Sequence, residues 1–253
     1  MKSSVERRSD ILALLQQTNS QRVEALAQHF GVSSVTIRND LNILEQQGLI
    51  TRSHGFAVLN SRLLAELSIA DKGTQFPELK QRIGKVAASL LHNGDRIILD
   101  SGTTTKAIVN HIGTLELTVL TNGLDIASEL VACPNVEVRM TGGVLRKNAM
   151  SFSGIMADNN LRLARFDKVF LGVDGFDLQK GVTTFNEQEA HLNRLMCDAA
   201  DQVIVVTDSS KFGQYSDFVI CQANQIDVLV TDDQLPEHYQ QQLESLGVMV
   251  LIA

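Results

Sequence analysis

The chain has 253 residues, of which 44% are hydrophobic, and a formal net charge of −7. This length allows one large domain or two smaller ones, and the composition is typical of globular proteins. No run of 18 apolar residues could span a bilayer, and the polar N-terminus is unlike a signal peptide, so we expect a cytoplasmic protein with no membrane partner. Three widely spaced cysteines and no Cys/His cluster with ligand spacing predict buried thiols, no structural metal and no cofactor.

The charge is unevenly distributed along the chain. Residues 1–60 carry six basic and five acidic side chains, whereas the remaining residues carry 16 basic and 24 acidic ones. A near-neutral N-terminal part on an acidic body is compatible with DNA binding only if its arginines share one face. The net charge alone therefore neither supports nor excludes DNA binding.

The first 60 residues predict three short helices and a β-hairpin. The first helix covers about residues 5–17, and the second has apolar residues at helical spacing before a stop at Gly31. Ser33 is placed to cap a third helix that runs to Gly48. Residues 49–52 and 57–59 then bracket a turn, which indicates the hairpin.

Two helices joined by a tight turn have the spacing that lets the second one enter a DNA major groove. With Ile37, Leu41 and Leu44 facing inward, the opposite face is polar. Arg38 suits guanine edges and Asn39 suits adenine, while hydroxyls suit phosphates. The predicted DNA contacts are Ser33, Ser34, Thr36, Arg38, Asn39, Asn42, Arg52 and His54. By periodicity alone, a three-helix cap or dimerisation module with a solvated polar face is the alternative.

The rest of the chain alternates helix and strand after a predicted linker over 60–76. A helix begins at Pro77, and strands are expected at 96–100, 117–121, 136–140, 168–173, 202–207, 226–231 and 248–252. Helices are expected at 104–112, 124–133, 157–164, 187–200 and 236–246. This alternation predicts an α/β domain over 77–253 with a mostly parallel sheet, separate from the N-terminal domain at 1–59.

Polar groups follow five of the predicted strands, at the edge where ligands bind in open α/β sheets. One loop, Ser-Gly-Thr-Thr-Thr, has hydroxyls and a helix start that favour an anion, although such a loop alone is more often a capping turn. The strand-end residues predicted to bind an effector are Asp100, Ser101, Gly102, Thr103, Thr104, Thr105, Asn122, Gly142, Gly143, Asp174, Asp208 and Lys211. Asn186 and Glu187 are either sugar-hydroxyl acceptors or a helix cap with a first-turn carboxylate, and Glu189 is expected at the surface.

The string VSSVTIRNDLNILEQQGLITRSHGFAVL resembles the N-terminal signature of the DeoR/GlpR family of sugar-metabolism regulators. Asn39 stands where the family pattern commonly has a second arginine, and Phe56 replaces the second glycine of the hairpin, which predicts a stiffer or more apolar tip. The resemblance implies a winged helix-turn-helix that binds double-stranded operator DNA.

Residues 66–253 resemble the sensor domain of the same family, which is similar to ribose-5-phosphate isomerase. The resemblance implies that the loop at 101–105 holds a sugar phosphate and that Lys80 adds positive charge. The strings SGTTT, SFSG, GVDGFDL and NEQEAHLNRLMC look most like regulators of N-acetylgalactosamine and related pathways. An amino-sugar or tagatose-type phosphate is therefore the expected effector.

These expectations combine into a repressor, acting as a dimer or tetramer, that a phosphorylated sugar releases from its operator. Two alternatives stay open. An isomerase-like enzyme fused to a DNA-binding head could use Asp174 as a base, although the segment after it, 178–182, matches the isomerase pattern only partly. A DNA-binding protein that senses nothing would lack a coherent ligand site.

Overall fold

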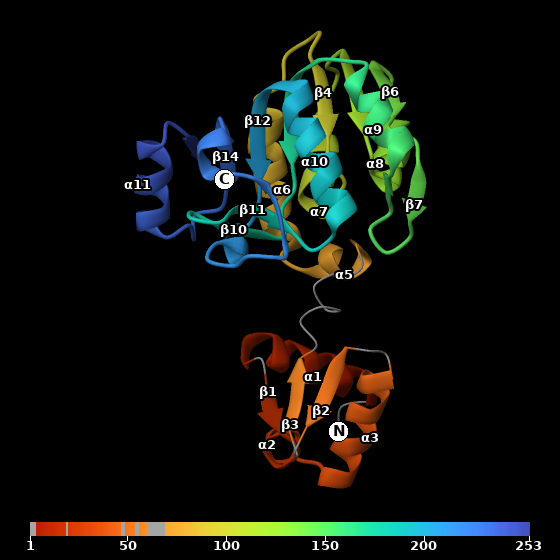
Figure 1. The fold of residues 1–253 in the computed structure, drawn as a ribbon, viewed down its shortest axis with the longest axis vertical. Helices are drawn as coiled ribbons and strands as arrows, with labels where there is room; N and C mark the ends of the chain where they lie inside the picture. The colour runs from red at the N-terminus through yellow and green to blue at the C-terminus, as the bar shows by residue number, and fades with distance from the viewer. Residues whose placement is uncertain (1–3, 19, 47–48, 54–55, 60–68) are drawn as a thin grey trace. The chain divides into compact units, whose positions relative to one another are not determined.

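The computed structural model describes residues 4–18, 20–46, 49–53, 56–59 and 69–253. The chain divides between Glu66 and Leu67 into two compact units, each with its own hydrophobic core. We call residues 1–66 the head and residues 67–253 the sensor unit (Figure 1).

The head consists of three helices and a small antiparallel sheet. Its elements are α1 (Ser4–Thr18), β1 (Ser20–Arg22), α2 (Val23–Phe30), α3 (Ser34–Gln46), β2 (Ile50–Ser53) and β3 (Phe56–Leu59). The predicted helices and hairpin are present, but sequence reasoning missed β1, which pairs with β3. Gly31 ends α2 in the left-handed conformation at φ 64°, which turns the chain sharply toward α3.

The sensor unit is built on a seven-stranded parallel sheet in the order β15-β14-β12-β9-β4-β5-β6. The strands are β4 (Arg96–Leu99), β5 (Leu117–Thr121), β6 (Val136–Met140), β9 (Phe166–Leu171), β12 (Ala200–Val206), β14 (Val228–Thr231) and β15 (Met249–Ile252). Each matches a predicted strand. Inner strands such as β4 and β14 are buried apolar runs that are easily recognised, whereas the edge strand β6 alternates apolar and polar residues.

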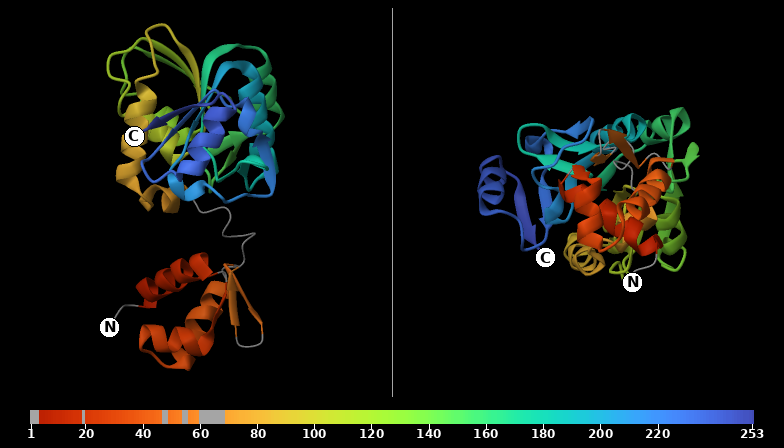
Figure 2. Two further views of the ribbon diagram at one scale, coloured as in Figure 1. Left: turned by 90° about the vertical axis from the view of Figure 1, so that its left-hand side faces the viewer. Right: turned by 90° about the horizontal axis from the view of Figure 1, so that it is seen from below.

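Helices cover both faces of this sheet (Figure 2). One core contains side chains of α6 (Pro77–Ala88), α7 (Thr103–Val109) and α8 (Leu124–Leu130), and the opposite one contains those of α9 (Ile155–Arg162) and α10 (Glu187–Ala199). Helix α11 (Glu237–Ser245) packs near β15. The approach of α6 to α7 is close, since a Cβ on Gly84 would lie 2.6 Å from the Ala107 carbonyl carbon.

Shorter elements complete the sensor unit. They are α5 (Ile69–Thr74), the hairpin β7 (Val144–Arg146) and β8 (Ser151–Ser153), the antiparallel strands β10 (Gly175–Asp177), β11 (Gly181–Thr184) and β13 (Phe218–Cys221), and two 3-10 turns, η1 (Ser209–Lys211) and η2 (Ala223–Gln225). The predicted linker at 60–76 contains a short helix at residues 69–74, and α6 begins at Pro77 as predicted.

The described residues contain no helix long and apolar enough to cross a membrane, and no group of three His, Cys, Asp or Glu side chains arranged to hold a metal ion. All three cysteines are free thiols; Cys221 is buried, whereas Cys133 and Cys197 are half-buried.

Candidate DNA-binding surface and effector site

Helix α3 is fixed in the head by an apolar face and a buried ion pair. Ile37, Leu41 and Leu44 are buried, as predicted. Asp40, also buried, accepts a hydrogen bond from Arg7 Nε at 2.6 Å. This arginine of α1 is therefore used to hold α3 in place, and the positive charge available to DNA comes from other residues.

The polar face of α3 carries the residues predicted to bind DNA. Arg38, Asn39 and Asn42 are exposed, and the Arg38 guanidinium lies 3.9 Å from Glu24. Ser33 caps the helix, because its Oγ accepts from the Thr36 amide at 3.1 Å. The exposed polar face and the capped N-terminus of α3 are thus free of the apolar core of the head.

The hairpin is tied to the recognition helix. The Arg52 guanidinium donates to Asn42 Oδ1, and the Arg52 amide donates to Glu45 Oε1 at 3.0 Å. Phe56 is half-buried beneath the Arg22 guanidinium, which lies 4.9 Å from its ring centre. His54, also predicted to contact DNA, lies outside the described residues.

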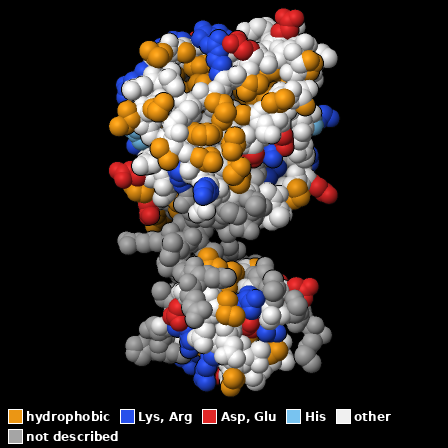
Figure 3. Space-filling view, turned by 90° about the vertical axis from the view of Figure 1, so that its right-hand side faces the viewer, with side chains coloured by type: hydrophobic (Ala, Val, Ile, Leu, Met, Phe, Trp, Pro, Cys, Tyr) orange, Lys and Arg blue, Asp and Glu red, His pale blue; other side chains and the backbone are white. Residues whose placement is uncertain are grey.

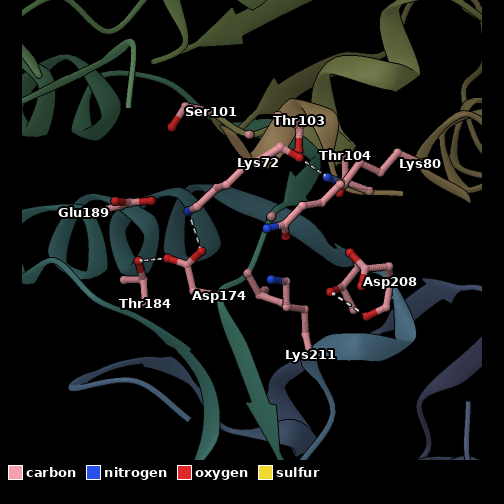
Figure 4. A pocket seen from close by; sticks show the side chains of 15 residues that line it. Lys72, Lys80, Ser101, Thr103, Thr104, Asp174, Thr184, Glu189, Asp208 and Lys211 are labelled. Carbon is pink, nitrogen blue, oxygen red and sulfur yellow. Dashed lines mark hydrogen bonds and ion pairs between the residues drawn. The ribbon is translucent and has the colours of Figure 1, made fainter. Parts of the chain in front are cut away.

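The sensor unit has a small cavity of about 50 Å³ beyond the carboxyl ends of β4, β9 and β12 (Figure 4). We call it the effector cavity. Eight predicted residues line it: Lys80, Ser101, Gly102, Thr103, Thr104, Asp174, Asp208 and Lys211. Sequence reasoning missed several others, namely Lys72, Gln75, Gly172, Val173, Thr184, Glu189 and Thr207.

The loop after β4 forms one wall of the cavity. No side chain of the described residues caps α7, so the first-turn amides have no partner within the helix. The Ser101 amide, in contrast, donates to Asn122 Oδ1 at 2.7 Å, and the Thr105 hydroxyl donates to the Gly102 carbonyl. The groups left for a ligand therefore lie at Gly102, Thr103 and Thr104 rather than over the whole predicted loop.

Asp100, Thr105 and Asn122 are buried beneath the cavity and do not line it. Asn122 Nδ2 lies 3.3 Å from Asp100 Oδ1, and Asn193 Nδ2 lies 3.4 Å from Asp100 Oδ2. Burial, reinforced by the charge of Glu189, raises the pKa of Asp100. These predicted contact residues instead support the loop from below.

Four other predicted residues lie away from the cavity. Gly142 and Gly143 follow β6, the edge strand of the sheet, too far along the strand order to reach the ends of β9 and β12. Asn186 caps α10, because its side chain accepts from the Glu189 amide at 3.1 Å, and Glu187 is exposed in the first turn. The helix-cap interpretation thus describes their contacts in this structure.

Three lysines and three carboxylates converge in the effector cavity. Lys72 Nζ lies 2.6 Å from Asp174 Oδ1, and the Thr184 hydroxyl donates to the other oxygen of Asp174 at 2.9 Å. Glu189, expected at the surface, instead lines the cavity and pairs with Arg146 at 2.8 Å. Figure 4 shows Lys72 reaching across the cavity to Asp174, with Lys80, Asp208 and Lys211 around it.

Burial controls the charge of these side chains. Burial alone would lower the pKa of Lys72, but the adjacent Asp174 carboxylate outweighs it and the pKa is raised. Burial lowers the pKa of Lys80 to about 8, because Asp208 only partly offsets the loss of solvent. Burial and the nearby Asp174 raise the pKa of Glu189. Lys72 is the permanent cation of the site, and Lys80 is a cation that can titrate.

The sequence matches two family models that together span most of the chain. The DeoR-like helix-turn-helix domain matches residues 7–63, and the DeoR C terminal sensor domain matches residues 75–233. The chain therefore belongs to the DeoR family of transcriptional regulators, as the sequence predicts. It is a DNA-binding regulator with a sensor domain and not an enzyme.

Individual relatives agree along their whole length. The "Putative aga operon transcriptional repressor" of Escherichia coli O157:H7 is 42% identical over 250 residues, which cover 98% of this chain and 93% of the relative. The "HTH-type transcriptional regulator GolR" of Listeria innocua is 35% identical over 249 residues, 98% of each chain. The predicted similarity to the Aga repressor group is thus confirmed.

Among solved structures, ribose 5-phosphate isomerase A from Methanocaldococcus jannaschii aligns over 54% of each chain with a TM-score of 0.40 and 15% identity. A similarity of this size supports no statement about ligand or activity.

Proposed function

We propose that this protein represses a carbohydrate-utilisation operon and that a phosphorylated sugar binding in the effector cavity relieves the repression. The observation that carries the proposal is the composition of the cavity. Lys72, Lys80 and Lys211 supply positive charge for a phosphoryl group, and Asp174 and Asp208 supply acceptors for sugar hydroxyls.

The arrangement of these groups supports an anionic polyol over an uncharged sugar. Lys80 Nζ is held at the α5–α6 side, close to the Thr103–Thr104 helix start, whereas Asp174 lies at the end of β9. A ligand that reaches both sides needs an anionic end and a hydroxyl-bearing end. The similarity to an aga operon repressor favours an amino-sugar or tagatose-type phosphate.

For the head, we propose that Arg38 and Asn39 read base edges while Ser33, Ser34, Thr36 and Arg52 contact the backbone. Palindromic operators require paired heads, so the protein acts as a homo-oligomer. Exposed apolar side chains on β7 and α9, including Val144, Ile155 and Met156, support an assembly surface, and Figure 3 shows hydrophobic side chains gathered on one face of the sensor unit.

The test is thermal unfolding of the full chain with a panel of hexose, amino-hexose and ketohexose 6-phosphates, beside their unphosphorylated sugars. A ligand at 100 times its dissociation constant should stabilise the sensor unit by about 2.7 kcal/mol. We expect a shift with one phosphorylated sugar and none with its parent sugar. Equal shifts with both, or none with any, would contradict the proposed effector class.

A further inference from the structure

Helix α5 is the first described element after the junction between the two units, and it lies beside two cavities. Lys72 of α5 lines the effector cavity. Ile69 and Gly73, also of α5, line a second cavity of about 450 Å³ together with Lys106 and Glu129. Among the residues of α5 whose burial is described, Ile69 and Lys72 are half-buried and Gly73 and Thr74 are exposed.

Polar bonds connect α5 to the rest of the sensor unit. Lys72 Nζ pairs with Asp174 at 2.6 Å, and Lys80 Nζ donates to the Lys72 carbonyl at 2.5 Å. At the other end of the helix, the Ile69 amide donates to the Asn148 carbonyl at 2.9 Å. The first two bonds use side chains of the effector cavity, whereas the third does not.

The Lys80 bond has a clear role in the helix. The Lys72 carbonyl belongs to the last turn of α5, where it also accepts from the Gln75 amide at 3.2 Å and where the helix dipole favours a cation. Lys80 supplies a second donor to this carbonyl, and it also supplies the positive charge. A phosphoryl group in the cavity offers Lys80 a fully charged acceptor in place of a carbonyl, and such hydrogen bonds are stronger.

The Lys72 bond faces the same competition. A sugar hydroxyl that donates to Asp174 takes the acceptor that Lys72 uses, while a phosphoryl group attracts the Lys72 ammonium itself. One bound molecule with an anionic end and a hydroxyl end can therefore replace both bonds together. The bond between Ile69 and Asn148 would remain, but it lies at the opposite end of the helix.

We propose that α5 couples the effector cavity to the head. In the DNA-binding state, α5 is attached to the rest of the sensor unit through the bonds of Lys72 and Lys80. The bound effector replaces these two bonds and detaches the helix. The inference rests on the proposed function for the identity of the effector and for the sign of the response. In the sequence, nine residues (60–68) separate β3, the last described strand of the head, from α5, so a change at α5 can be passed along the chain to the head. Because coupling is reciprocal, DNA should also weaken effector binding.

The first experiment needs no effector. In full-length protein, Lys72→Met removes the ammonium but keeps a long side chain, and Lys85→Met alters an exposed lysine of α6 as the matched control. The probe is a duplex selected from random sequence by the wild-type protein, and hydrogen exchange follows the amides of residues 69–75. We expect Lys72→Met to exchange at least tenfold faster there and to bind the duplex at least fivefold more weakly, with Lys85→Met unchanged.

Unchanged exchange at 69–75 in Lys72→Met would show that the ion pair does not hold α5. Faster exchange with unchanged DNA affinity would show that α5 does not control the head. Either result overturns the proposal without bearing on whether a sugar phosphate binds.

The second experiment keeps every residue of the effector cavity. A disulfide between Ile69→Cys and Asn148→Cys, at backbones that are already hydrogen-bonded, fixes α5 when oxidised and frees it when reduced. Galactosamine 6-phosphate and tagatose 6-phosphate serve as probes. One of these compounds is expected to shift the melting temperature. In the reduced protein, we expect this compound to weaken DNA binding at least tenfold. In the oxidised protein DNA binding should change less than twofold.

An equal response in both redox states would overturn the role of α5. If neither compound shifts the melting temperature of the wild type, the proposed effector class fails instead, and the comparison of Lys72→Met with Lys85→Met still decides the role of α5.

Discussion

Lys72 changes the interpretation of the cavity more than any other residue. Its position in a segment that reads as a linker gave no signal of a role, yet its ammonium occupies the centre of the site against Asp174. Glu189 was missed for a related reason, since a glutamate in the first turn of a helix is usually solvated. Only contacts between distant segments distinguish these side chains from surface ones.

At the residue scale, Arg38→Ala should weaken binding to the selected duplex by about 1–3 kcal/mol, because a bidentate contact to guanine is lost. Arg162→Ala, at an exposed position of α9, is the control and should leave DNA affinity unchanged. Fluorescence anisotropy with selected and scrambled duplexes measures both. Equal loss on the two duplexes would indicate a phosphate contact, and no loss on either would exclude Arg38 from the interface.

Lys80 makes effector binding depend on pH. Its pKa is lowered to about 8, so the ammonium that attracts a phosphoryl dianion is present at pH 7 and is lost as pH rises through 8. We expect the affinity for the sugar phosphate to fall by up to about tenfold per pH unit above pH 8. Titration calorimetry between pH 7 and 9.5 measures this, and Lys80→Arg, which stays charged, should show no such fall. A pH-independent wild type would contradict the assignment.

The lowered pKa of Lys80 also affects the free energy of unfolding. An unfolded lysine has a pKa near 10.5, so the unfolded chain binds more protons than the folded one between pH 8 and 10.5. The contribution of Lys80 to the free energy of unfolding therefore rises with pH in that window.

At the scale of elements, the strands that carry the sensor sheet were predictable and the small ones were not. Strands such as β4 and β12 are apolar runs flanked by helices, which periodicity identifies. Strands β1 and β10 have three residues each, and β1 pairs with β3, which lies far away in the sequence. The same holds for α5, whose six residues include a glycine and show no apolar stripe.

The cap of α10 gives a prediction for an element. Asn186→Ala should reduce the free energy of unfolding by about 1 kcal/mol, because the Glu189 amide loses its acceptor. The affinity for the sugar phosphate should stay within twofold. Urea unfolding and calorimetry measure the two quantities, with Glu187→Gln as the exposed control. Loss of affinity without loss of stability would return Asn186 to the effector site.

At the scale of the whole molecule, the two units have separate cores. Leu41 is completely buried in the head, and Leu41→Ala should destabilise the head by about 2–5 kcal/mol through a cavity. We expect calorimetry to show a lower head transition and an unchanged sensor transition that still responds to sugar phosphate. Val35→Ala, at an exposed position of α3, is the control. One cooperative transition that falls as a whole would contradict independent units.

The sequence by itself determined the two-part organisation, the recognition helix and the parallel sheet, because all three depend on local periodicity, caps and apolar runs. It also placed Lys80, Asp174 and Asp208 at the strand and helix ends that surround the cavity. Only the tertiary structure decided which polar residues face the cavity, which support it from below, and that Lys72 of α5 lines it. Those distinctions depend on the order of strands and on side chains brought together across the sheet, and local sequence does not encode either.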